Sequence, residues 1–352
     1  TEVGLSKGDG TRTTLKRTAS EWQVAERGWP ADTTKVRKLL LDLGALNIVE
    51  EKTRLPANYP QLGVEDVNSP KAGGTRVALS GAGKSWALIV GKSSSAKSGY
   101  VRVASAPQTL LAAPLLSVDA DPKSWLERTI LDIPAERVRH VEEHPPEGAA
   151  FSLAKEKKEQ SNFGVTPLPK GRELSAPGAA DAIAGGLAAL TLEDVAKAQA
   201  TDGKSTGATS PAADNADPKG ADAKGADAKG ADGKGSAGKT AESKPARALF
   251  QTFDGLEIEV NGHKNGTRAL ISVSAHAGGK EAEAEAQKLQ ARLAGWEFDI
   301  PEYKYNTLFR PLEELLKKPP EPPKKPTKAA AKSSAPKAAA PESPAPEPPP
   351  AH

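Results

Sequence analysis

The fold is decided by a stretch that spans residues 75–90 and reads TRVALSGAGKSWALIV. Its two ends, Thr75–Leu79 and Trp86–Val90, are short apolar runs separated by a turn that contains Gly81 and Gly83. Two such runs around a glycine-containing connection are typical of a β-hairpin. The stretch therefore predicts two paired strands, and the rest of the first half of the chain is interpreted around them.

The same stretch also fits a loosened phosphate-loop pattern from Ala78 to Ser85, with alanine in place of the usual first glycine. A phosphate loop needs a helix directly after it, because the amide groups at the helix N-terminus bind the phosphates. The residues after Lys84 are instead aromatic and β-branched, and they end at Gly91. We interpret Lys84 as part of a hairpin turn, and a nucleotide site is the alternative.

Other elements extend this hairpin into an α+β module that we place at residues 1–147. A helix should begin after Asp32, a good N-cap residue, and end near Gly44. Its apolar stripe consists of Val36, Leu39, Leu40 and Leu43. We expect further strands at Glu21–Ala25, Leu46–Val49, Tyr100–Val103 and Arg137–Val141, and a short helix from Pro122.

A second α+β module is expected at residues 148–316. It should contain a strand from Phe151, a helix at Ala179–Lys197 that Gly185 and Gly186 weaken, a hairpin, a charged helix at Lys280–Leu293 and a strand at Trp296–Ile300. The hairpin pairs Leu256–Val260 with Ala269–Val273 around Asn265 and Gly266. Trp125 precedes Ile133-Pro134 as Trp296 precedes Ile300-Pro301, which favours tandem related modules; chance recurrence is the alternative.

Two segments lack the side chains for a core. Residues 201–245 repeat Ala-Asp-Ala-Lys-Gly with seven Lys and seven acidic residues, and residues 317–352 are rich in Pro, Ala and Lys. Ordering a residue costs about 1–2 kcal/mol of chain entropy. Segments with so few apolar side chains cannot bury enough surface to offset this cost. We expect a disordered linker that interrupts the second module and a disordered tail.

Composition excludes several classes of function. The chain has no Cys, so disulfide frameworks, cysteine nucleophiles and zinc-cysteine clusters are excluded. The net charge is +3, and residues 317–352 alone carry seven Lys and three Glu, so the remainder has no basic excess. Nucleic acid is therefore not expected as a partner. The chain begins at Thr1 without any Met, and we expect that a natural start with a signal peptide or membrane anchor is missing.

A second motif, His140-Val141-Glu142-Glu143-His144, has the His-x-x-Glu-His spacing of one class of zinc peptidases. Zinc ligands at this spacing need a helix, whereas the preceding residues alternate and Pro145-Pro146 follows directly. On a strand the two histidines would lie roughly 13 Å apart. We therefore interpret the segment as the end of a strand, with a metal site as the alternative.

The remaining candidates are weaker. His263, His276 and His352 are scattered, and Asp254-Gly255 is interpreted as a turn. We place the tryptophans Trp22, Trp86, Trp125 and Trp296 in the core. The sequence thus predicts no catalytic, cofactor-binding or metal-ligating residues and no cofactor.

Laid out in order, these residues resemble the domain of unknown function 4340 family. The resemblance covers most of residues 12–316. It is carried in the first module by Trp22–Glu26, Gly28–Asp32, Tyr59–Asp66, Leu88–Lys92, Tyr100–Arg102 and Trp125–Val138, and in the second by Thr252–Leu256 and Gly295–Pro301.

The resemblance implies a membrane-anchored envelope protein with no established catalytic residues. Related sequences accompany ABC-type transporters of the gliding-motility auxiliary kind. We therefore expect a non-enzymatic auxiliary component on the periplasmic side of the inner membrane, anchored by an N-terminal helix and in contact with membrane subunits of a transport system. The alternatives are a scaffold that binds cell wall or a surface polymer, and a nucleotide- or zinc-dependent enzyme. The transported substrate and the oligomeric state are left open.

Overall fold

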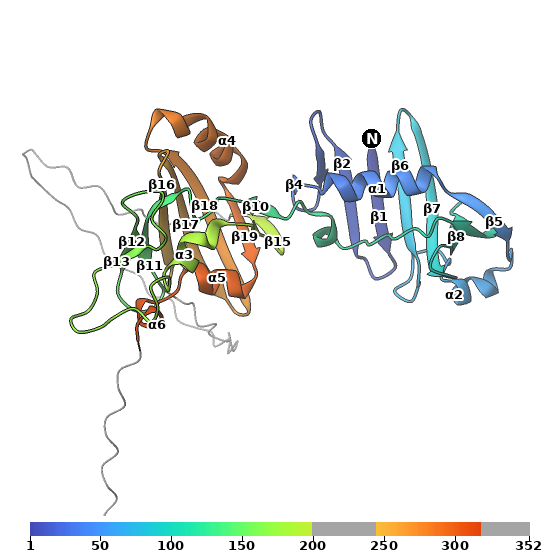
Figure 1. The fold of residues 1–352 in the computed structure, drawn as a ribbon. Coiled ribbons are helices and arrows are strands. Elements are labelled where there is room, and N and C mark those ends of the chain that lie inside the picture. The colour runs from blue at the N-terminus through green and yellow to red at the C-terminus, as the bar shows by residue number, and fades with distance from the viewer. Residues whose placement is uncertain (199–243, 318–352) are drawn as a thin grey trace, which may run out of the picture. The chain divides into compact units, whose positions relative to one another are not determined.

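Two antiparallel sheets organise the chain in the computed structural model, which describes residues 1–198 and 244–317 (Figure 1). The described residues belong to one unit, and the buried apolar side chains of both sheets form a continuous cluster. Every strand pairing in these ranges is antiparallel, which confirms the predicted α+β class. The predicted linker and tail lie almost entirely outside the described residues.

The first sheet has nine strands in the order β4-β3-β2-β1-β6-β7-β8-β9-β5. Its strands are β1 (Glu2–Lys7), β2 (Arg12–Arg17), β3 (Trp22–Val24), β4 (Trp29–Pro30), β5 (Asn47–Glu51), β6 (Thr75–Gly81), β7 (Lys84–Ser93), β8 (Gly99–Val103) and β9 (Thr109–Ala113). The predicted hairpin is β6 and β7, and it occupies the middle of the sheet, where β6 also pairs with β1.

Helix α1 (Thr33–Gly44) lies across one face of this sheet (Figure 1). The Asp32 side chain accepts hydrogen bonds from the backbone N–H groups of Thr34 and Lys35, so the predicted N-cap is confirmed. Val36 and Leu39 are buried against the strands, while Leu40 and Leu43 pack at the margin. On the other face, α2 (Tyr59–Leu62), which directly follows η1 (Pro56–Asn58), contributes Tyr59 to a small second cluster with Val64 and Ile89.

The second sheet has eight strands in the order β13-β12-β11-β16-β17-β18-β19-β15. Its strands are β11 (Val138–His144), β12 (Phe151–Ala154), β13 (Gly164–Thr166), β15 (Asp194–Lys197), β16 (Ala246–Thr252), β17 (Leu256–Asn265), β18 (Arg268–Ala277) and β19 (Trp296–Ile300). Strand β11 pairs with β12 and β16, so this sheet begins ten residues before the boundary that we expected at 148. Alternation correctly predicted the strand, but it carries no information about which sheet the strand joins.

Short helices complete the second sheet. They are η3 (Gly185–Leu187), η4 (Lys280–Ala282), α3 (Asp181–Ala184), α4 (Glu283–Leu293), α5 (Glu302–Leu308) and α6 (Leu312–Leu315). The charged helix was predicted correctly as α4, which packs against β18. The helix expected at Ala179–Lys197 is wrong, because α3 stops at Ala184, the two glycines begin the short turn η3, and the chain then forms the strands β14 (Leu190–Thr191) and β15.

Residues 114–137 connect the two sheets. They contain η2 (Pro122–Trp125) and β10 (Thr129–Leu131), and β10 pairs with β14. The indole of Trp29 in β4 has its ring centroid 5.4 Å from that of Trp296 and 5.2 Å from that of Phe298, both in β19. The Arg27 guanidinium donates to the Asp194 carboxylate at 2.7 Å. We call the side chains of Arg27, Trp29, Asp194, Trp296 and Phe298 the joint. Trp296 belongs to the joint and Trp125 does not, so the two tryptophans of the predicted repeat occupy different environments.

Candidate functional site

The stretch that resembles a phosphate loop is a two-residue hairpin turn. Gly81 pairs with Lys84, and the two residues between them, Ala82 and Gly83, have φ values of 51° and 75°. Positive φ at both central residues defines the type I′ turn that suits a two-residue hairpin loop. The residues after the turn are extended in β7, so the hairpin prediction is confirmed. Trp86 in this hairpin is 40% exposed, which corrects its predicted place in the core.

The motif with His-x-x-Glu-His spacing lies on β11, as predicted. His140 is partly exposed and its Nε2 atom lies 3.6 Å from a carboxylate oxygen of Glu142. Within residues 1–198 and 244–317, no group of three or more His, Cys, Asp or Glu side chains is placed to hold a metal ion. The unexpected member of the motif is Glu143, which is completely buried and whose two carboxylate oxygens have no hydrogen-bond partner.

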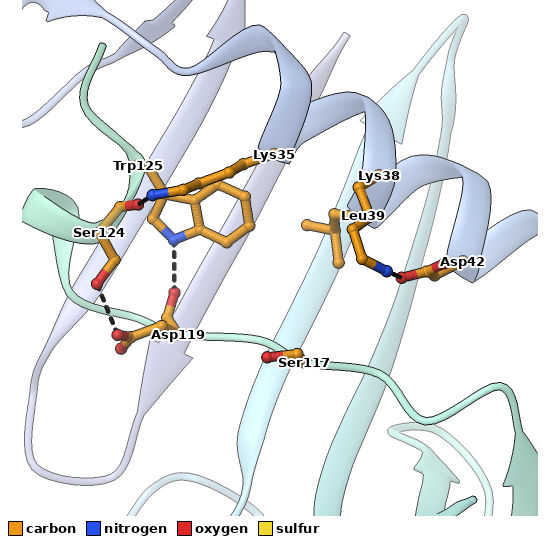
Figure 2. A pocket seen from close by; sticks show the side chains of 8 residues that line it. All are labelled: Lys35, Lys38, Leu39, Asp42, Ser117, Asp119, Ser124 and Trp125. Carbon is orange, nitrogen blue, oxygen red and sulfur yellow. Dashed lines mark hydrogen bonds and ion pairs between the residues drawn. The ribbon is translucent and has the colours of Figure 1, made fainter. Parts of the chain in front are cut away.

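A small cleft lies between α1 and the segment before β10. Figure 2 shows its lining, in which Lys35, Lys38, Leu39 and Asp42 come from α1 and face Ser117, Asp119, Ser124 and Trp125. Its volume is about 290 Å³. Leu39 and Trp125 are its buried apolar members, and the charged side chains come from both elements.

The charged groups of this cleft are engaged with one another or with the backbone. Lys35 Nζ donates to the Ser124 carbonyl at 2.8 Å, and Lys38 Nζ donates to Asp42 at 2.6 Å (Figure 2). Partial burial opposes ionisation of Asp119, but hydrogen bonds from Ser124 Oγ and the Asp121 N–H outweigh it and lower its pKa. Asp119 is thus held as an anion, and its backbone carbonyl accepts from Trp125 Nε1 at 2.7 Å. The bond from Lys35 joins α1 to the connecting segment, and the bonds of Asp119 hold that segment in its own conformation.

Strand β5 is an exposed strand at one end of the first sheet. It is the last strand of the first sheet and pairs only with β9. All five of its residues are exposed, and the side chains of Ile48 and Val49 are 66% and 59% exposed. Val49 has no partner residue in β9, because the register shifts between Ile48 and Glu50. We call Asn47–Glu51 the β5 edge.

The other edge strands of the two large sheets are shorter or partly buried, so they expose less backbone to a partner. Strand β4 has two residues, one of which is Pro30, and β13 has three residues with Pro167 directly after it. Strand β15 has four residues, of which Asp194 and Val195 are buried. Proteins protect edge strands in such ways because an open edge can pair with another chain. The β5 edge is therefore the candidate interaction surface among the described residues.

Sequence reasoning predicted a strand at Leu46–Val49 but not its exposure. Ile48 and Val49 were identified as strand residues, and two apolar side chains in a short strand favour a buried position. Whether the strand lies at an edge depends on pairing with β9, some sixty residues further along the chain, which local pattern does not encode. The signal that was present is the pair Glu50 and Glu51, because charged residues mark a strand that faces solvent.

Comparisons with known proteins identify one family. The sequence pattern described as "Domain of unknown function (DUF4340)" matches residues 22–211. No curated protein and no solved structure matches the chain. None of the helices in the described ranges has the length and apolar character needed to cross a membrane. The match covers the first sheet from β3 onward and more than half of the chain, and the protein therefore belongs to the DUF4340 family.

Proposed function

We propose that the protein is a non-enzymatic accessory component of an ABC-type transport or envelope assembly system that acts by protein–protein contact. It would work on the periplasmic side of the inner membrane, held there by an N-terminal membrane helix. The resemblance on which the expectation rests is supported by the family match. The role itself follows from related sequences that accompany such transporters.

The observation that carries the proposal is the β5 edge. An exposed edge with two large apolar side chains is costly to leave in water, and such surfaces mark contact sites for other proteins. The cleft between α1 and the segment before β10 also supports a contact role, because its Lys35, Lys38 and Asp42 side chains are engaged in contacts within the protein. A contact role therefore accounts for the surface better than a reaction at this cleft.

Co-purification from the native envelope tests the proposal. The tagged full-length chain is expected to be recovered from the membrane fraction together with the permease or ATPase subunits of a transporter. Ile48→Lys should lose these subunits, while Tyr303→Lys, at a similarly exposed side chain away from β5, should retain them. Recovery of the chain from the envelope without any transporter subunit would contradict the transport role.

A scaffold that binds the cell wall or a surface polymer through the Pro- and Lys-rich tail is the second candidate. It is favoured by the charge of residues 317–352, with seven Lys against three Glu. Removal of these residues should abolish co-sedimentation with isolated cell wall if this candidate is right. Under the transport proposal the truncated chain should still recover the transporter subunits.

A further inference from the structure

The β5 edge has a defined arrangement of side chains as well as open backbone. Ile48 pairs with Ala112 and Glu51 pairs with Leu110, and both of these β9 residues contribute to the core on the face that α1 covers. Because Val49 is the extra residue of a bulge, Ile48 and Glu51 fall on the same face of the sheet even though they are three residues apart. Asn47 and Glu50 fall on the opposite face, beside Ala113 and Leu111.

We propose that the β5 edge binds an extended segment of a partner protein, which adds to the first sheet as a tenth strand and carries Lys or Arg beside Glu50 and Glu51. This inference rests on the contact role proposed above and specifies its chemistry. The unpaired backbone groups of β5 would hydrogen-bond to the segment, and an apolar side chain of the segment would cover Ile48. Backbone bonds and the apolar contact supply affinity, while the glutamates select the partner.

The size of the edge favours an extended segment over a second copy of the chain. Five residues span roughly 17 Å, which is long enough for a peptide strand. A stable dimer usually buries more than about 1,000 Å² in total, which one strand pair of this length does not supply by itself. A parallel pairing of two copies would also bring the glutamates of one β5 beside those of the other.

Charge complementarity favours a basic segment. The side chains of Glu50 and Glu51 remain 56% and 67% exposed, although Lys52 Nζ lies 2.6 Å from Glu50 and an Arg54 nitrogen lies 3.9 Å from Glu51. Both of these cations lie on the C-terminal side of the edge, so the carboxylates stay accessible to a second cation. An acidic segment would place like charges side by side and would be rejected.

The test uses the full chain and two fluorescein-labelled octapeptides. Both alternate Val and Thr, and one carries two N-terminal lysines where the other carries two glutamates. Fluorescence anisotropy should show binding of the lysine peptide, and hydrogen exchange should show protection of residues 47–51. Ile48→Lys should weaken binding about tenfold or more. The double variant Glu50→Lys, Glu51→Lys should reverse the preference in favour of the glutamate peptide.

Leu168→Lys is the matched control, because Leu168 is an exposed apolar residue outside β5, and it should bind the lysine peptide like the natural chain. Equal binding of both peptides, equal loss in Leu168→Lys, or no protection of residues 47–51 would overturn the proposal. A dimer in analytical ultracentrifugation that Ile48→Lys dissociates would overturn it in favour of self-pairing. Peptide binding is measured without any transporter, so this result and the co-purification result can fail independently.

Discussion

The Glu143 side chain is a carboxyl group inside the core of the second sheet. It lies on β11 between Phe151 of β12 and Ala248 of β16, which are its paired residues and are buried as well. Burial without a hydrogen-bond donor raises the pKa of Glu143 well above its usual value, so the folded protein holds a proton there. Alternation from Val141 places Glu143 on the buried face of β11, so the sequence carries a signal for its burial.

Glu143→Gln should change how stability depends on pH. The folded state keeps the proton, whereas the unfolded chain releases it above its ordinary pKa of 4.5, so the free energy of unfolding falls as pH rises above that value. Urea unfolding at pH 5–8 should show that Glu143→Gln lessens this fall, so the stability of the variant rises relative to that of the natural chain as the pH rises. The exposed neighbour provides the control: Glu142→Gln should retain the natural slope. Identical slopes in all three proteins would mean that Glu143 ionises freely.

Gly262 in β17 is required by close packing. A Cβ atom there would lie 2.4 Å from a Phe309 ring carbon and 2.9 Å from a Tyr305 ring carbon. Gly262→Ala should therefore lower the free energy of unfolding by about 1–3 kcal/mol, as over-packing of a core does. Gly164→Ala in β13 is the control, because its new Cβ would meet its nearest atom at an ordinary 3.7 Å. Equal stability of the two variants in urea would contradict this packing.

At the scale of elements, local signals predicted those elements whose pattern is complete within one segment. The hairpin of β6 and β7, the N-cap of α1 and the helix α4 each followed from residues that are neighbours in sequence. The failures are elements decided by distant partners or by competing propensities. Gly185 and Gly186 disfavour continuation of the helix beyond α3. Val195, which we expected on that helix, is instead buried in β15.

The β6–β7 turn gives a prediction that separates a hairpin from a phosphate loop. Ala82 has a φ of 51°, which is unfavourable for alanine and favourable for asparagine, so Ala82→Asn should raise the free energy of unfolding by about 0.5–1 kcal/mol. Lys84→Ala should alter it by no more than about 0.5 kcal/mol. ATP should leave the melting temperature of all three proteins unchanged. An ATP-dependent rise that disappears in Lys84→Ala would restore the nucleotide-site interpretation.

At the scale of the whole molecule, the second sheet joins segments from both sides of residues 199–243. Strand β15 before the gap and β16 after it belong to the same sheet, with β17, β18 and β19 between them. Asp194 of β15 accepts a hydrogen bond from Arg27 in the joint. Partial burial opposes ionisation of Asp194, but the hydrogen bond from Arg27 helps lower its pKa. The family, the fold class and most strands could be predicted from the sequence, whereas the joint and the β5 edge depend on contacts between residues far apart in the chain.

Shortening the connection at residues 199–243 to ten residues should leave the fold intact. Strands β15 and β16 are four strand spacings apart, roughly 19 Å, which ten extended residues can span. A shorter loop lowers the entropy cost of closure, so urea unfolding should show a gain of about 1 kcal/mol. A loss of stability, or fragments from cleavage at Gly220 that fold and do not associate, would show that the two sides are independent domains.

The β5 edge is the proposed contact site for another protein, and crosslinking in living cells tests this most directly. A photoreactive amino acid is placed at Val49 in one strain and at the exposed Tyr303 in a second strain. After irradiation, we expect a discrete adduct between the Val49 variant and an envelope protein, and none from the Tyr303 variant. Absence of an adduct at Val49 in cells where the protein is stably present, or the same adducts from both positions, would show that the β5 edge is not a contact site.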